Sequence, residues 1–493
     1  MPGALNMTDC LEPLSAGEGQ IGPSVTYPNV RFGFAPAISC GNLGAKNTLG
    51  DGMNNSTEAT GYLEDFRARG EAITDACTRC GACFRACPMV APAGLGDADA
   101  AETAAGIVDL ITGGSGNPEA VRWASVCSGS GNCIPACPEG INARFMVQLA
   151  RGFARAQAGD KPLNTRWRQG FQTMSRGVRI LSRLQLPPET LARVRGQAEM
   201  RRESPPDVVF YTGCNILKTP HIALLCLDTL DRLGVDYEVM GGPGQCCGVY
   251  QFREGDFANT ARVGYTTIDG LAAAGTSTVL SWCPSCQVQI GEVALPSYEE
   301  RFGARPFDLN PFLVFLADHA EALARLMTHR VDKRVALHER PVLPSVQAAV
   351  RKLLSIIPGV ELVEIDVPRV GTQANSLAVL PAFKRELVQR ELAAVADAGV
   401  TTLATIYHAC HRELCDVGDG RSFEVVNFME ILGEGLGLHA EDLYKRLKQI
   451  GDIDDIIVET SPLIAEHELD LETVRDALLQ EFGGSGRGMP APR

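Results

Sequence analysis

Four cysteines lie close together early in the chain, in the pattern C-x2-C-x2-C-x3-C-P. They are Cys77, Cys80, Cys83 and Cys87, and Pro88 follows the last of them. Such short loops let thiolates converge on one cube of iron and sulfide. A structural zinc site does not use a run of four cysteines that ends in proline. The run therefore predicts that this part of the chain binds an iron-sulfur cluster.

A second run, CSGSGNCIPACP, occupies residues 127–138 and contributes three more cysteines. In ferredoxins with two clusters, the last cysteine of each run binds the cluster of the other run. This exchange predicts one [4Fe-4S] cluster, and its ligands are Cys77, Cys80, Cys83 and Cys137. A second cluster is then bound by Cys87, Cys127 and Cys133.

The second run has Ser130 where alignment with the first run places a cysteine. A serine hydroxyl gives up its proton far less readily than a thiol, so it is a poor ligand for iron. Two interpretations stay open. We favour a [3Fe-4S] cluster that lacks the fourth iron, and the alternative is a [4Fe-4S] cluster completed by Ser130 or water. The spacing C-x5-C-x3-C-P resembles the three-iron motif of the iron-sulfur proteins of succinate dehydrogenase and fumarate reductase.

Five further cysteines follow in the pattern C-x31-CC-x35-C-x2-C, and they are Cys214, Cys246, Cys247, Cys283 and Cys286. Each is expected in a loop or at the end of a strand, where α/β folds build their sites. Two adjacent cysteines do not reach one iron comfortably, so the pair suits two irons of a larger cluster. The pattern resembles the cysteine-rich CCG domain of the heterodisulfide reductase superfamily (its HdrB-like proteins). That resemblance implies a non-cubane [4Fe-4S] cluster on these five cysteines.

The remainder of the chain lacks a second complete set of this kind. Family members often carry a second HxPCH stretch, CCG and CxxC, but the stretch at His338 has no cysteine, and residues 374–381 (ANSLAVLP) stand where CCG is expected. The stretch HACHRELC keeps His408, Cys410, His411 and Cys415. These side chains are of kinds that bind metals. We expect a relic of a site in a structural domain, with a metal site as the weaker alternative.

Hydrophobic periodicity predicts the elements that position these residues. Residues 142–157 have helical spacing, and Cys226 lies on the apolar face of a helix over 221–234, where it is expected in the core. Strands are predicted over 207–214, 235–240 and 277–286, then over 334–339, 360–368 and 400–410, with helices between them. This alternation is typical of parallel sheets. The predicted fold class is multidomain α+β: a helical two-cluster ferredoxin-like domain followed by two α/β CCG-type units, the second degenerate.

Composition divides the chain into six predicted segments. They are an extended or partly disordered arm (1–65), the ferredoxin-like domain (66–150), a basic helical connector (151–205), the CCG domain with its cluster (206–328), the degenerate CCG domain (329–482) and a flexible tail (483–493). The connector holds 12 Arg or Lys and 4 Asp or Glu. It is either a solvated link or a docking surface for an acidic partner or an anionic membrane.

The bulk composition excludes several classes of protein. A net charge of −14 over 493 residues argues against nucleic acid as a partner. Seventeen cysteines in a large chain without an export signal favour metal binding over disulfides. No run of apolar residues is long enough for a transmembrane helix. We expect a cytoplasmic protein, with peripheral contact to the inner face of the membrane as an open alternative.

The order of a ferredoxin-like domain and two CCG units resembles fused HdrC/HdrB-like proteins of the heterodisulfide reductase superfamily. These include the iron-sulfur subunits of glycolate oxidase and anaerobic glycerol-3-phosphate dehydrogenase. The chain has no flavin fingerprint, so the resemblance implies FAD or FMN on a partner flavoprotein dehydrogenase. The predicted function is to relay electrons from that partner to a quinone, an electron-transferring flavoprotein or a similar acceptor. The alternatives are disulfide reduction with Cys246 and Cys247 as catalytic residues, and a structural or assembly role.

Overall fold

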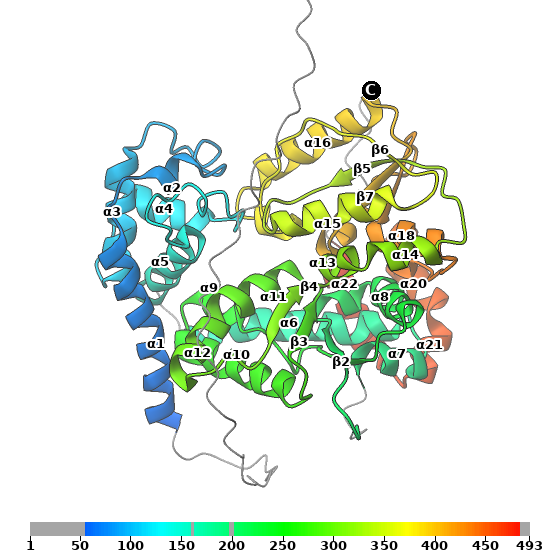
Figure 1. Ribbon diagram of the computed structural model, residues 1–493, viewed down its shortest axis with the longest axis horizontal. Helices are drawn as coiled ribbons and strands as arrows, with labels where there is room; N and C mark the ends of the chain where they lie inside the picture. The colour runs from blue at the N-terminus through cyan, green and yellow to red at the C-terminus, as the bar shows by residue number, and fades with distance from the viewer. Residues whose placement is uncertain (1–54, 159–161, 197–201, 484–493) are drawn as a thin grey trace, which may run out of the picture. The chain divides into compact units, whose positions relative to one another are not determined.

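The computed structural model describes residues 55–158, 162–196 and 202–483 (Figure 1). Cys10, Cys40, the first 54 residues of the predicted arm and the tail from residue 484 lie outside the described residues. Helix α1 (Asn55–Ala76) begins inside the predicted arm. Residues 55–65 are therefore helical rather than extended, because α1 packs on the protein: Phe66 is fully buried against Phe252 and Phe257.

Four more helices frame the first two cysteine runs: α2 (Ala82–Arg85), α3 (Ala100–Ile111), α4 (Pro118–Val126) and α5 (Ala143–Gln157). The helix predicted over 142–157 is present as α5. Asp99, Asn117 and Asn142 cap α3, α4 and α5, and each side chain accepts a backbone N–H of the first turn. Such caps satisfy donors that have no partner inside the helix. Trp123 and Leu149 are buried in the core between these helices.

The basic segment forms helices α6 (Leu163–Arg183) and α7 (Pro188–Arg195). Part of its positive charge is paired within the chain. Arg193 contacts Asp228 at 2.7 Å and Asp231 at 2.6 Å, and Arg155 is paired with Glu254. A docking role for this segment stays a prediction.

The first sheet has four parallel strands in the order β2-β1-β3-β4. They are β1 (Val208–Tyr211), β2 (Tyr237–Met240), β3 (Thr278–Ser281) and β4 (Asp308–Pro311). The helical elements of this part are η1 (Asn215–Lys218), α8 (Pro220–Leu233), α9 (Val249–Glu254), α10 (Phe257–Ala272), α11 (Pro284–Val288), η2 (Gln289–Ala294), α12 (Leu295–Phe302), α13 (Phe312–Asp318) and α14 (Ala320–Leu326). Each of the three strands predicted here contains an observed strand.

The second sheet is also parallel, in the order β6-β5-β7-β8. Its strands are β5 (Arg334–His338), β6 (Glu361–Leu362), β7 (Thr402–Thr405) and β8 (Glu424–Asn427), and its helical elements are α15 (Pro344–Ser355), η3 (Ala374–Leu377), α16 (Pro381–Asp397), α17 (His408–Leu414) and α18 (Phe428–Leu436). The strand predicted over 360–368 is wrong in length. Edge strand β6 ends at Leu362, and the N–H of Val363 still donates to the carbonyl of Val335 at 2.8 Å. The strand predicted over 400–410 is also too long, because β7 ends at Thr405 and α17 begins at His408.

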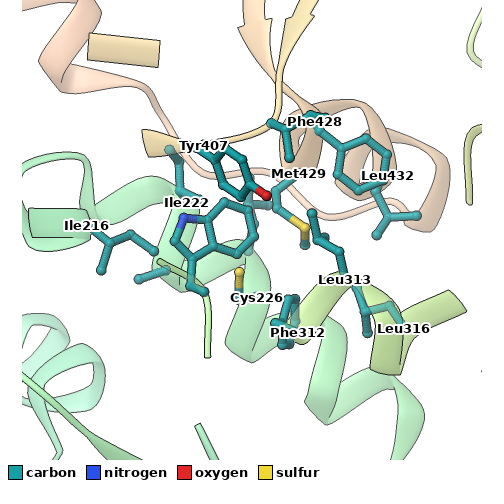
Figure 2. Close-up of a cluster of buried hydrophobic side chains, with 14 of the residues drawn as sticks. Ile216, Ile222, Cys226, Phe312, Leu313, Leu316, Tyr407, Phe428, Met429 and Leu432 are labelled. Atoms are coloured by element: carbon teal, nitrogen blue, oxygen red, sulfur yellow. The ribbon is translucent and has the colours of Figure 1, made fainter. Parts of the chain in front are cut away.

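Four C-terminal helices follow: α19 (Leu443–Ile450), α20 (Ile453–Glu459), α21 (Ser461–Glu466) and α22 (Leu471–Phe482). The predicted mixed character of helices and parallel sheets is confirmed, whereas the domain boundaries stay predictions. Figure 2 shows Ile222 and Cys226 of α8 in one hydrophobic cluster with Phe428, Met429 and Leu432 of α18. Cys226 is fully buried there, as predicted. Within the described ranges, no helix is both long and apolar enough to cross a membrane.

Candidate iron-sulfur sites

The first predicted cluster site is a small pocket, and its lining includes Cys77, Cys80, Cys83 and Cys137. The last of these comes from the second run, as the exchange between runs predicts. Gly81 turns the loop with φ 72°, and a Cβ there would lie 2.5 Å from the backbone of Ala100, so the turn requires glycine. Burial raises the pKa of Cys83 to about 11, and the neighbouring thiols add to the rise. Crowded thiols of this kind fit a cluster, because iron stabilises the thiolates that burial disfavours.

The second predicted site gathers Cys87, Cys127 and Cys133. Burial raises the pKa of the Cys133 thiol, and Cys127 and then Cys87 raise it further, which requires the three groups to be near one another. Cys127 is the C-cap residue of α4, so the end of that helix fixes its position. The three thiols again fit a cluster, with one ligand fewer than the first site.

Ser130, the residue in the place of the fourth cysteine, is buried and already hydrogen-bonded. Its Oγ accepts the backbone N–H of Gly371 at 2.7 Å and lies 3.2 Å from Oγ of Ser128. The residue is only 6% exposed, and these contacts satisfy its hydroxyl without an iron atom.

The five cysteines of the CCG pattern meet at the carboxyl edge of the first sheet. Cys214 follows β1, Cys246 and Cys247 follow β2, and Cys283 and Cys286 follow β3. Because the strands are parallel, their carboxyl ends lie at one edge, where α/β sheets bind ligands. The last four are buried, and Cys214 is partly exposed. Four of the five lie in loops, as predicted, whereas Cys286 lies in the short helix α11.

The thiols of this set interact with one another. A hydrogen bond from Cys246, then one from Cys286, lowers the pKa of Cys247. Gly213 has φ 66°, and a Cβ there would approach Sγ of Cys286 to 3.0 Å. Glycine therefore lets the backbone come close to the sulfurs. Five soft sulfur donors packed in this way fit an iron-sulfur cluster.

A loop of the second sheet region joins the second and third cysteine sites. The N–H of Thr372 donates to the carbonyl of Ser128 at 3.0 Å, and Nε2 of Gln373 donates to Oγ of Ser285 at 2.7 Å. Ser128 adjoins Cys127, and Ser285 lies between Cys283 and Cys286. Two consecutive residues thus bridge two cysteine loops. Sequence reasoning missed this contact, although the loop directly precedes the residues that replace the second CCG.

Arg144 of α5 also links the loop after Cys127 to the second sheet region. Its Nη1 donates to the carbonyl oxygens of Gly129 at 3.2 Å and Val342 at 3.0 Å, and its guanidinium is paired with Glu292. The Arg144 side chain is 3% exposed, whereas Glu292 is partly exposed to water. Sequence reasoning did not single out this residue, because its partners are far away along the chain.

The four residues of the predicted relic site do not converge. Cys410 is hydrogen-bonded to His338 and Arg340, and the side chain of His411 contacts Asp442. His408 and Cys415 are buried in other surroundings, His408 near Lys218 and Arg412, and Cys415 near Lys448. The set does not form one metal site, because consecutive turns of α17 direct these side chains to different neighbours.

A cavity of about 200 Å³ lies beside the loops that Thr372 and Gln373 bridge. Its lining includes Cys127, Ser285, Arg151, Arg155, Arg253 and Glu254. Three arginines and one glutamate give this lining a positive balance. The cavity therefore suits a small anionic molecule between the second and third sites.

Two family comparisons cover the cysteine-rich part of the chain. Residues 73–141 match the family described as a 4Fe-4S dicluster domain, and residues 208–291 match the family described as a cysteine-rich domain, CCG. The first match spans all seven cysteines of the two runs, and the second spans all five of the CCG pattern.

Curated relatives extend the likeness over most of the chain. The D subunit of the dihydromethanophenazine:CoB–CoM heterodisulfide reductase of Methanosarcina acetivorans is 24% identical over 404 residues, which cover 74% of this chain and 95% of the relative. The protein of the same name from Methanosarcina barkeri is 24% identical over 399 residues, 74% of this chain and 94% of the relative. The family matches and these relatives confirm the predicted resemblance: the chain has segments similar to a 4Fe-4S dicluster domain and to a CCG domain, and over most of its length it is similar to subunits of heterodisulfide reductase.

Proposed function

We propose that the chain is the electron-transfer subunit of an oxidoreductase complex, and that it takes electrons from a partner flavoprotein that carries FAD or FMN. The acceptor is a quinone, an electron-transferring flavoprotein or a similar molecule. The observation that carries the proposal is the bridge made by Thr372 and Gln373, because it sets two cysteine sites side by side. When bound, clusters at the three sites supply one-electron oxidation and reduction.

The residues around the sites have two tasks in this proposal. Burial of Cys246, Cys247, Cys283 and Cys286 excludes water from the third site. Hydrogen bonds to the cysteine loops, such as that from Thr372 to Ser128, keep the second site in position. In iron-sulfur proteins, burial and nearby hydrogen bonds set the reduction potential.

The second site is proposed to hold [3Fe-4S]. Support comes from Ser130, whose hydroxyl already accepts the N–H of Gly371. The first and third sites are proposed to hold [4Fe-4S] and a non-cubane [4Fe-4S] cluster.

Electron paramagnetic resonance with iron and sulfide counting on anaerobically purified protein tests the cluster content. About 11 irons per chain, with the signal of an oxidised three-iron cluster that disappears on reduction by dithionite, is the expected result. About 12 irons without that signal contradict the three-iron assignment. Protein that carries no iron after anaerobic purification contradicts the relay and favours the structural or assembly role.

The relay itself is tested with an artificial donor and acceptor. Chemically reduced FMN is expected to reduce the bound clusters, and a water-soluble quinone is expected to reoxidise them over many cycles. The same assay is repeated with an electron-transferring flavoprotein in place of the quinone, and the absence of turnover with either acceptor in fully loaded protein contradicts the proposed direction of electron flow.

A second candidate function is reduction of a disulfide at the third site, with Cys246 and Cys247 as the catalytic residues. Two observations favour it: the relatives are named as heterodisulfide reductase subunits, and the positively charged cavity next to Ser285 suits an anionic substrate. Reduced viologen dye with a carboxylate-bearing disulfide provides the assay. Disulfide-dependent dye oxidation that Cys247→Ser abolishes favours this function over the relay.

A further inference from the structure

Two buried histidines and two partly buried carboxylates outside the cysteine sites face one another. They are His221, His411, Glu430 and Asp442, and one possible ligand atom of each lies within 4.8 Å of the others. His221 lies in the first turn of α8, which packs near the first sheet. The other three belong to α17, to α18 and to the N-cap of α19, about 200 residues further along the chain. The group therefore joins two distant parts of the sequence.

The hydrogen bonds of His411 show where its protons lie. The hydroxyl of Thr405 donates to the carbonyl of Val426 at 3.1 Å, so its oxygen accepts the N–H of His411 Nδ1 at 3.2 Å. The other ring nitrogen, Nε2, lies 2.6 Å from Oδ2 of Asp442. A neutral imidazole would point a lone pair at that carboxylate. A positive charge, either a proton or a metal ion, must therefore lie between the two groups.

The surroundings of His221 favour a metal ion over a proton. It is 2% exposed, and neither of its ring nitrogens makes a hydrogen bond. Nδ1 lies 3.4 Å from Oδ1 of Asp442, and Nε2 lies 3.7 Å from Oε1 of Glu430. A buried polar group without a partner is costly. A cation inside the group would give His221 the bond that it lacks.

The two carboxylates are held in place before any ion binds. Oε1 of Glu430 accepts the N–H of Asn427 at 2.6 Å, and Oδ1 of Asp442 accepts the N–H of Lys445 at 3.0 Å. Two carboxylates and two neutral imidazoles balance the charge of a divalent ion. The nearby ammonium of Lys445 donates to the carbonyl of Val425 at 3.0 Å, so it is not directed at the group.

We propose that His221, His411, Glu430 and Asp442 bind one divalent transition-metal ion, and that this ion is zinc. Zinc accepts histidine nitrogen and carboxylate oxygen as ligands, and four protein ligands leave a zinc ion no open position, whereas non-haem iron sites keep open positions. Binding replaces the proton on Nε2 of His411, which is released to solvent. The ion would fasten α8 to the elements around the second sheet, next to the hydrophobic cluster that α8 and α18 share (Figure 2).

Zinc content and the zinc X-ray absorption edge of the full-length, cluster-loaded protein test this proposal. The protein is incubated anaerobically with Zn²⁺, desalted and analysed for metal. About one zinc per chain, with only nitrogen and oxygen neighbours, is the expected result. Zinc with sulfur neighbours would mean that the metal occupies cysteine sites, and either that result or zinc at background level would overturn the proposal. Because this measurement uses the unaltered chain, its result does not depend on whether a variant folds.

His221→Gln removes one ligand and leaves both helix caps intact. We expect at least a tenfold loss of retained zinc and no increase of the melting temperature when zinc is added. His408→Gln is the matched control, because His408 is buried on the same helix as His411 but lies outside the group. The control is expected to keep its zinc and its increase in melting temperature. An equal loss of zinc in both variants, or no loss in His221→Gln, contradicts the assignment of ligands.

Discussion

Glu481→Gln tests the buried charges that hold the last helix, α22, on the protein. Oε2 of Glu481 lies 2.5 Å from Nζ of Lys218, and Oε1 accepts from Nη1 of Arg412 at 2.8 Å and from the hydroxyl of Tyr444 at 3.0 Å. These three partners lie on η1, α17 and α19. Removal of the carboxylate charge leaves two largely buried cations without their counter-ion.

The magnitude follows from the shift in the pKa of Glu481. Burial alone would raise this pKa, but Arg412 and then Lys218 outweigh burial and lower it from 4.5 to about 2. Because one pKa unit corresponds to about 1.4 kcal/mol, the ionised carboxylate contributes about 3.5 kcal/mol to the free energy of unfolding. The glutamine variant is expected to lose a similar amount, in the range known for a broken buried ion pair.

Hydrogen exchange of the α22 amides is the assay, because the chain is too large for one two-state unfolding transition. A loss of about 3.5 kcal/mol corresponds to exchange about 300-fold faster in the variant at neutral pH. Glu472→Gln is the matched control, since Glu472 lies on the same helix and is exposed. The control is expected to exchange at the rate of the unaltered chain.

The stabilisation by Glu481 is expected to depend on pH in a known direction. The folded-state pKa is depressed, so the stabilisation is fully present above pH 4.5 and is lost as the pH falls from about 4.5 to about 2. The difference between the two chains should therefore stay constant from pH 7 to pH 5. Equal exchange in the two chains at pH 7, or a difference that already shrinks at pH 6, would refute the reasoning.

Three further substitutions test the cysteine sites. Ser130→Cys supplies a fourth thiol, so iron should rise from about 11 to about 12 per chain and the three-iron signal should disappear; an unchanged signal contradicts the role given to this position. Gln373→Ala removes the 2.7 Å contact with Ser285 and should slow turnover with quinone while the iron count stays the same; unchanged turnover argues against the bridge. Arg144→Met removes the hydrogen bonds from Arg144 to Glu292 and to the carbonyls of Gly129 and Val342, so we expect about 2 kcal/mol of local destabilisation and poorer iron retention at the second site, measured by hydrogen exchange of the α5 amides and by iron analysis.

The sequence predicted the grouping of the thiols because local rules fix it. C-x2-C spacing brings sulfurs together within one turn of chain, and the parallel strands β1 and β3 place Cys214, Cys283 and Cys286 at one edge. The exchange of the last cysteine between runs placed Cys137 with the first run. Each of these rules acts over a few residues or depends on a repeated strand direction, so it can be read from spacing.

The contacts that the sequence did not predict join residues far apart in the chain. Gly371 donates to Ser130 across 241 positions, and Arg144 contacts the carbonyl of Val342 across 198 positions. No spacing rule relates such pairs, and backbone groups take part in both. The four-residue group around His411 is of the same kind, because its partner His221 lies on α8. The sequence grouped His411 with His408, Cys410 and Cys415, whereas in the structure its ring lies beside Asp442 and His221.

The second sheet region lacks most of the cysteines expected there, but it still contacts the cysteine sites of the first half of the chain. Residues 371–373, next to the position of the missing CCG, hydrogen-bond through Gly371 and Thr372 to the loop after Cys127, and through Gln373 to Ser285. A second cluster in this place would need thiols that point into its own sheet region. The present loop directs its polar groups toward the other two sites, so it contributes to those sites without a cluster of its own. The same reasoning explains why Ser130 can replace cysteine: its hydroxyl accepts a hydrogen bond from Gly371, which a thiol accepts only weakly.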